Sequence, residues 1–296
     1  MITMRTNPFA SDVGILTEEE LLYVEQKVIE TFRYQLQARK LFPIRSVPDA
    51  KFYRFYDETD PSGASITMDG KAQSDDFPEK TAHDLKWPVI SKEFLLNWRD
   101  IDISRRQGPS ILDDSIRTAT RMVAQTEDRL LISGETAGWP ALGVEGLFTA
   151  TGRNTDASAG NWPANSVADV NAAVALLEAD GFVGVKPIMV GPPALISCLD
   201  GPIANTGITY RSFLLNNNLI SGTISTPNVF TAAGGVNSVV LVIPGEDNFY
   251  AMQGVPLMTR LWEDKAGNVH GTVRESIVPV IGRPTAICET TAIVCA

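Results

Sequence analysis

The sequence predicts an α+β fold, in which helices and strands occupy separate stretches of the chain. Three observations support this class. An amphipathic helix is expected near the start, a longer helix is expected over residues 110–133, and strand-like segments dominate residues 225–280. Hydrophobic residues make up 44% of the 296 residues and charged residues 20%, so the chain can fill a core.

The first helix is predicted to begin at Thr17 and to end before Pro43. Thr17 followed by Glu20 forms a capping box, in which the hydroxyl and the carboxylate each accept a hydrogen bond from an unpaired backbone N–H group. Apolar residues recur at steps of three and four, which gives the helix one stripe to bury: Leu21, Val24, Val28, Phe32 and Leu36.

Residues 48–92 are predicted to form an extended, two-stranded arm. Residues 51–56 alternate as a strand does, residues 57–63 have the composition of a turn, and residues 64–68 suggest a second short strand. A polar run covers residues 69–84, and extended structure resumes at Trp87. Two strands with so little apolar content cannot bury enough surface alone, so we expect a neighbouring subunit to cover the arm.

The long helix is expected to open at Pro109 and Ser110 and to end at Gly134. Beyond it we predict an exposed loop over residues 149–165, a helix over 167–178, a buried strand over 186–190 and a short helix over 192–199. Strands are expected over 225–231 and 239–243. A hairpin turn at residues 264–268 joins two further strands, over 249–262 and 272–280.

Composition argues against several classes of function. The net charge of −10 disfavours sequence-specific DNA binding, and no apolar segment is long enough to span a membrane. The two histidines, His83 and His270, and the three cysteines lack the spacing of a metal site, so we expect no metal and no cofactor. The odd number of cysteines predicts no disulfide framework and a reducing compartment, with Cys288 as a core residue. The first 14 residues lack the apolar core of a secretory signal, so a cytoplasmic protein is expected.

Paired carboxylates are the one feature that suggests catalysis. They occur at residues 75–76, 113–114, 127–128 and 263–264, and a hydrolase could use two of them if the fold brought them together. We favour a structural role. Glu127, Asp128 and Arg129 are expected to pair with Arg117 or Arg121 on the helix surface and to give subunit edges complementary charge.

The order of these parts resembles the major capsid proteins of tailed bacteriophages (the Hong Kong 97 fold) and the related encapsulins. The resemblance rests on short motifs: FYRFYD from residue 52, GKAQSDDFP from 70, EDRLLISG from 127, GVEGL from 143 and ESIVPVIGRP from 275. It implies an N-terminal arm and helix (residues 1–47), an extended arm (48–92), a peripheral domain with a spine helix (93–150 and 255–296) and an axial domain (151–254).

The resemblance implies a self-assembling icosahedral shell made of many copies of this chain. Its expected assembly interface comprises Phe52, Tyr53, Phe55, Tyr56, Asp75, Asp76, Phe77, Trp87, Glu127, Asp128 and Arg129. We weigh a capsid that encloses viral DNA through weak, non-specific contacts first, with scaffold, portal or decoration proteins as further partners. The alternative is an encapsulin shell that encloses a cargo protein, and a carboxylate-dependent hydrolase is the remote alternative.

Overall fold

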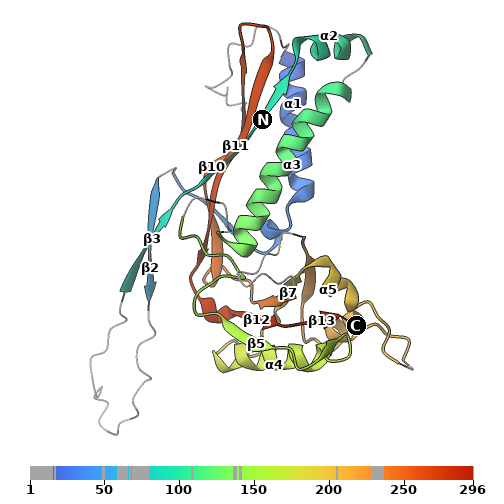
Figure 1. Ribbon diagram of the computed structural model, residues 1–296. Helices are drawn as coiled ribbons and strands as arrows, with labels where there is room; N and C mark the ends of the chain where they lie inside the picture. Colours follow the sequence, from blue (N-terminus) through green and yellow to red (C-terminus); the bar gives the residue numbers. More distant parts are fainter. Residues whose placement is uncertain are drawn as a thin grey trace.

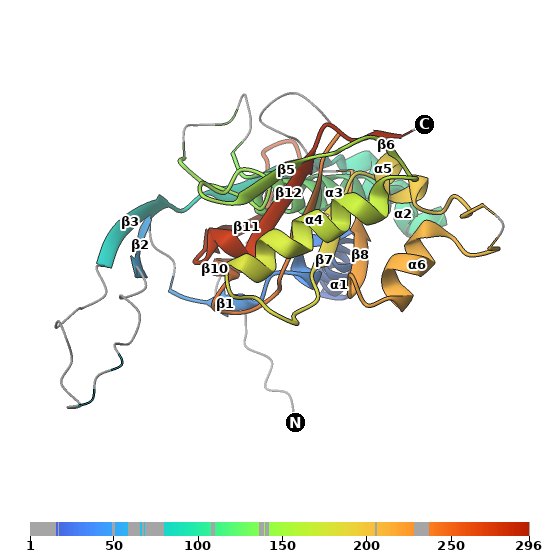
Figure 2. The same ribbon diagram turned by 90° about the horizontal axis from the view of Figure 1, so that it is seen from below.

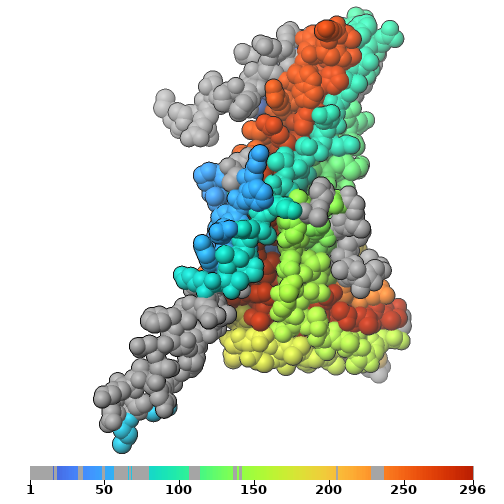
Figure 3. All heavy atoms as spheres, turned by 60° about the vertical axis from the view of Figure 1, so that its left-hand side comes forward, coloured from blue at the N-terminus to red at the C-terminus, as the bar shows by residue number. Residues whose placement is uncertain are grey.

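The computed structural model describes residues 16, 18–48, 51–58, 66, 68, 80–107, 110–135, 139, 142–204, 206–227 and 237–295. The molecule is elongated and has two sheet-containing parts (Figure 1). Two long helices lie beside a long β-ribbon in one part, and short strands with three helices form the other. A β-hairpin projects from the side of the molecule, between the two parts (Figures 1 and 3).

Helix α1 (Glu18–Gln35) packs its predicted apolar stripe against helix α3 (Ser110–Ser133). Val24, Val28 and Phe32 are buried in the larger of two hydrophobic clusters. The proposed capping residue Thr17 lies outside the described residues, whereas Glu20 forms an ion pair with Arg105 of helix α2 (Trp98–Gln107). A 3₁₀ turn, η1 (Ala38–Lys40), follows α1 before Pro43.

Helix α3 ends at Gly134, as predicted, because the chain turns there with a φ of +70° that favours glycine. A Cβ atom at Gly134 would lie 2.5 Å from the backbone nitrogen of Gly146, so the two segments touch through their glycines. This close contact directs the chain from the end of α3 toward the second part of the molecule.

The first sheet has the strand order β1-β10-β11-β4. Its strands are β1 (Ile44–Ser46), β4 (Val89–Leu96), β10 (Phe249–Glu263) and β11 (Val269–Ile281). The predicted hairpin between β10 and β11 is confirmed: Asp264 accepts hydrogen bonds from the backbone N–H groups of Ala266 and Asn268. Helix α3 contacts β4 and β11 of this sheet, and β1 adds a parallel edge strand on β10.

The second sheet has the order β5-β12-β9-β7-β8. Its strands are β5 (Asn154–Ala157), β7 (Ile188–Gly191), β8 (Gly222–Ser225), β9 (Val239–Val242) and β12 (Ile287–Thr291). Helices α4 (Ser166–Ala179), α5 (Pro193–Cys198) and α6 (Tyr210–Asn216) complete this part, and α4 lies across β5 and β12 (Figure 2). The pairing of β12 with β5 and β9 places residues 287–291 here, whereas we had expected them in the peripheral part.

We predicted one exposed loop over residues 149–165, and this prediction is wrong. They contain β5 and a two-residue strand, β6 (Asn161–Trp162), which pairs with β13 (Val294–Cys295) near the end of the chain. Trp162 is buried and its indole N–H donates to Asp169 at 2.7 Å, and the Trp162–Pro163 peptide bond is cis. The tryptophan explains the difference, because a buried indole with a satisfied N–H fixes this segment onto α4.

The arm is a two-stranded antiparallel hairpin of β2 (Phe52–Glu58) and β3 (Lys80–Lys86). The expected strand over residues 51–56 is confirmed. Residues 80–84, which we had placed in the polar tip, form part of the second strand instead. Arg54 and Asp84 join the two strands through contacts of 2.6 and 2.7 Å. The second strand predicted over 64–68 lies largely outside the described residues.

The absence of a disulfide was a wrong prediction. Cys198 and Cys295 are disulfide-bonded, with 6.2 Å between their Cα atoms, while Cys288 is a buried free thiol as expected. The pairing joins positions 97 residues apart in the sequence, so spacing gave no sign of it. None of the described helices is both long and apolar enough to cross a membrane.

Candidate assembly interface

The hairpin of β2 and β3 exposes aromatic side chains that the chain itself does not cover. Phe52 and Tyr56 are 64% and 59% exposed, whereas Tyr53 and Phe55 between them are half-buried. The alternation follows the two faces of a strand. Phe55 stacks on His83 of β3, with 5.1 Å between the ring centroids. The exposed face of this hairpin therefore carries two aromatic rings on either side of the ion pair between Arg54 and Asp84, and the described residues leave these rings uncovered.

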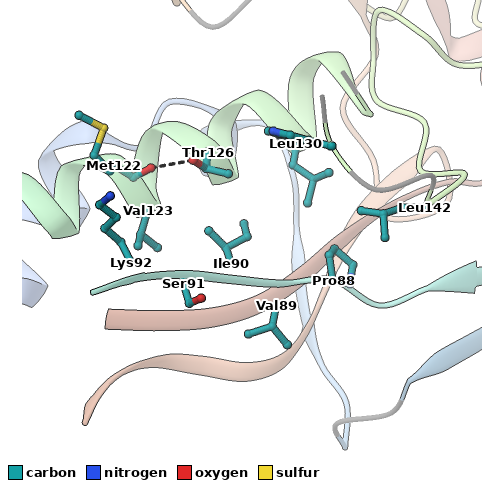
Figure 4. Close-up of a pocket in the computed structure, with 11 residues that line it drawn as sticks. Pro88, Val89, Ile90, Ser91, Lys92, Met122, Val123, Thr126, Leu130 and Leu142 are labelled. Carbon is teal, nitrogen blue, oxygen red and sulfur yellow. Dashed lines mark hydrogen bonds between the residues drawn. The ribbon is translucent and has the colours of Figure 1, made fainter. Parts of the chain in front are cut away.

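A groove of about 370 Å³ lies between helix α3 and strand β4 (Figure 4). Its lining is mostly apolar. In the figure the side chains of Ile90, Val123 and Leu130 lie between the helix and the strand. Val89 and Met122 at its rim are exposed. We call this feature the α3–β4 groove. It is a second surface on which apolar side chains are exposed.

A second groove, of about 560 Å³, lies between helix α1 and strand β10. Ile29 and Phe32 of the helix, and Leu36 directly after it, line the groove together with Pro256 and Leu257 of the strand. Arg39, Lys40 and Gln253 add a polar end. We call this the α1–β10 groove.

The acidic pair in the last turns of α3 is buried rather than displayed at a subunit edge. Glu127 and Asp128 are 0% and 1% exposed. Asp128 accepts hydrogen bonds from the backbone N–H groups of Gln37 and Ala38, at 3.0–3.1 Å. Arg39 donates to Glu127 at 2.7 Å and also pairs with Glu275 of β11. The expected solvated pairing along the helix surface is therefore wrong for Glu127, and Asp128 holds the start of η1.

Burial changes the protonation of this cluster. Removal from water, and then the negative charge of Glu275, raise the pKa of Glu127 to about 8, while Arg39 opposes the shift. One oxygen of Glu127 and one of Glu275 have no hydrogen-bond partner among the described residues. A protonated Glu127 relieves the repulsion between the two buried carboxyl groups beside Arg39. Gln253 donates to Glu275 at 2.5 Å and completes the cluster.

The remaining predicted interface residues have different surroundings. Trp87 is 7% exposed and packs against Tyr53 in the core, so it is not an exposed anchor. The guanidinium of Arg129 lies over the ring of Trp139, 5.4 Å from its centroid. Asp75, Asp76 and Phe77 lie outside the described residues.

We did not predict Arg39 and Glu275 as the partners of Glu127. They are 88 and 148 residues away from it in the chain, and although Glu275 opens the motif ESIVPVIGRP, that motif gives no sign of an ion pair. Glu127 and Glu275, which share Arg39, are both sealed from solvent, so this pair of acids does not face a cleft that could admit a substrate. Among the residues that the structure describes, no three acidic, histidine or cysteine side chains are grouped as metal ligands would be.

The sequence pattern of the Linocin_M18 family, described as "Encapsulating protein for peroxidase", matches residues 12–278. The chain belongs to this family. It is 26% identical over 277 residues to the type 1 encapsulin shell protein EncA of Myxococcus xanthus (strain DK1622), and the match covers 92% of each chain. It is 29% identical over 198 residues to a diheme-cytochrome-encapsulin shell fusion protein of Kuenenia stuttgartiensis, covering 62% of this chain and half of that protein.

Solved structures confirm the predicted fold. The virus-like particle from Pyrococcus furiosus superposes with a TM-score of 0.69 at 15% identity, covering 92% of this chain and 99% of that one. The capsid of Myoviridae phage XM1 gives a TM-score of 0.66 at 11% identity, covering 86% and 90%. The chain thus has the Hong Kong 97-type capsid fold. The family match favours the encapsulin alternative over the phage capsid that we had weighed first.

Proposed function

We propose that this chain is the subunit of an encapsulin shell, and that the closed shell holds a protein cargo in the cytoplasm. The observation that carries the proposal is the family match, which spans the arm, most of the first sheet and every strand of the second sheet except β12. The arm supports it: an isolated two-stranded hairpin with exposed Phe52 and Tyr56 gains stability only when another surface covers it.

In this proposal the hairpin of one copy packs into the α3–β4 groove of another copy. The exposed aromatic rings of the hairpin and the mostly apolar groove are both left open by the described residues, so a second copy can cover each at once. Each contact is modest, and closure of a symmetric shell multiplies it.

Two variants test this contact. A Phe52→Ser, Tyr56→Ser double variant removes the exposed aromatics of the hairpin, and Met122→Asp places a charge at the rim of the α3–β4 groove. We expect both to remain folded by circular dichroism but to lose closed shells in electron micrographs. Ile208→Ser is the control, because Ile208 is exposed just before helix α6, which lies at the opposite end of the molecule from the hairpin (Figure 2), and it does not line the α3–β4 groove. Normal shells from both variants would contradict the proposed contact.

The cargo is proposed to dock an apolar segment in the α1–β10 groove. Exposed Ile29 and the apolar lining give a surface that a peptide can cover, and Arg39 and Lys40 bound its polar end. An Ile29→Asp variant should still form closed shells but lose co-purifying protein, as measured by mass spectrometry of purified shells. Leu22→Asp, which alters an exposed residue of α1 outside the groove, is the matched control and should keep its cargo. If Ile29→Asp abolishes the shell itself, the groove belongs to a subunit contact.

A further inference from the structure

The disulfide between Cys198 and Cys295 joins two short elements at one end of the second sheet. Cys198 is the last residue of helix α5, and Cys295 lies in β13, which contacts α5. The enclosed segment runs through α6 and strands β8 to β12, so it includes both long strands of the first sheet. The bond therefore fastens the C-terminal end of the chain across the second part of the molecule.

Non-covalent contacts hold the same end weakly. Strand β13 has only two residues, and its partner β6 also has two. Ile293 is buried and donates its backbone N–H to Asn237 at 2.9 Å, but Val294 and Cys295 beyond it are exposed. A two-residue strand with exposed side chains opens easily, so the covalent bond is the main restraint beyond Ile293.

The disulfide is open to reagents in solution, because Cys295 is exposed and Cys198 is half-buried. The third cysteine does not compete for it. Cys288 lies buried in β12, and burial raises the pKa of its thiol to about 12, so it stays protonated and does not act as a nucleophile.

We propose that Cys198 and Cys295 form a reversible redox latch that fixes the C-terminal strand β13 in the oxidised state and releases it in the reduced state. The reductant is a low-molecular-weight thiol of the glutathione class. One thiolate attacks Sγ of exposed Cys295, which forms a mixed disulfide and expels the Cys198 thiolate, and that thiolate takes up a proton. A second thiolate attacks the mixed disulfide, frees Cys295 and leaves as oxidised glutathione, and the reverse sequence closes the latch. The latch rests on the chain's own contacts and does not depend on the proposed shell.

The test uses the full-length protein, purified without reductant and incubated over a range of reduced-to-oxidised glutathione ratios. Native alkylation followed by mass spectrometry counts accessible thiols. We expect no alkylated cysteine at oxidising ratios and two, Cys198 and Cys295, at reducing ratios. Carboxypeptidase should then remove the C-terminal residues about ten times faster from the reduced protein. The rate of cleavage follows the fraction of molecules in which β13 has detached, and reduction raises that fraction.

Two variants make the outcome decisive. The Cys295→Ser variant should lose its C-terminal residues at the fast rate of the reduced wild type at every glutathione ratio. The Cys288→Ser variant should respond to the ratio as the wild type does. Alkylation of Cys198 and Cys295 in excess oxidised glutathione would overturn the disulfide. Equal carboxypeptidase rates in the oxidised and reduced wild type would overturn the latch, even if the disulfide forms.

Discussion

Replacing Arg39 by methionine tests the buried ion pairs that connect η1 to helix α3 and to strand β11 of the first sheet. The guanidinium contacts Glu127 and Glu275, both buried, and methionine retains much of the side-chain bulk but no charge. The carboxylate pair would then keep a buried negative charge with no cation beside it. Removal of one partner from a buried ion pair costs about 3 kcal/mol, which for a chain of this size lowers Tm by about 5 °C.

The assay is thermal unfolding followed by tryptophan fluorescence at a fixed scan rate, since unfolding of a large assembly is often irreversible. Arg106→Met is the control, because Arg106 forms an exposed pair with Asp102 one turn earlier on α2, and it should change Tm little. Adding Glu275→Gln to the Arg39 variant removes the uncompensated charge and should recover most of the lost Tm. A Tm for Arg39→Met within about 2 °C of the wild type would show that Arg39 does not stabilise the fold through Glu127 and Glu275.

Two further outcomes follow from the same region. Because the pKa of Glu127 is raised from 4.5 to about 8, the folded chain binds this proton more tightly than the unfolded chain, so the contribution to stability is full below pH 4.5 and is lost as pH rises to about 8. Glu127→Gln should flatten the dependence of Tm on pH over this interval, and an unchanged slope would contradict the assignment. Gly146→Ala should lower Tm, because its Cβ would lie 2.3 Å from the backbone nitrogen of Gly134, whereas Gly222→Ala, with open space around it, should not; equal Tm values for the two would contradict the close contact.

Local signals predicted helices α1, α3, α4 and α5 and the hairpin turn, whereas the short helix α6 was not predicted. The apolar spacing of Val24, Val28 and Phe32 reflects one buried face, and Gly134 supplies a backbone conformation that other residues adopt at a cost. These features depend on residues within a few positions of each other, which a single sequence displays directly.

Long-range pairings could not be predicted in this way. Strand β3 is polar and almost fully exposed, so its composition resembles a loop, and only its register with β2 identifies it. In the sequence, Glu127 and its neighbours look like a solvated helix face. Only the packing of the folded chain brings Arg39 and Glu275 to Glu127. The bond between Cys198 and Cys295 could not be predicted for the same reason, because the two cysteines meet only when β13 packs beside α5.

Expression of this chain alone, followed by negative-stain electron microscopy and analysis of the particle contents, tests the central claim most directly. We expect closed shells of one uniform size, low nucleic-acid absorbance and, when the shells are taken from the native cell, a co-purifying protein. Subunits that stay monomeric under all conditions would contradict the shell. Closed particles filled with DNA would contradict the encapsulin assignment and support the phage capsid instead.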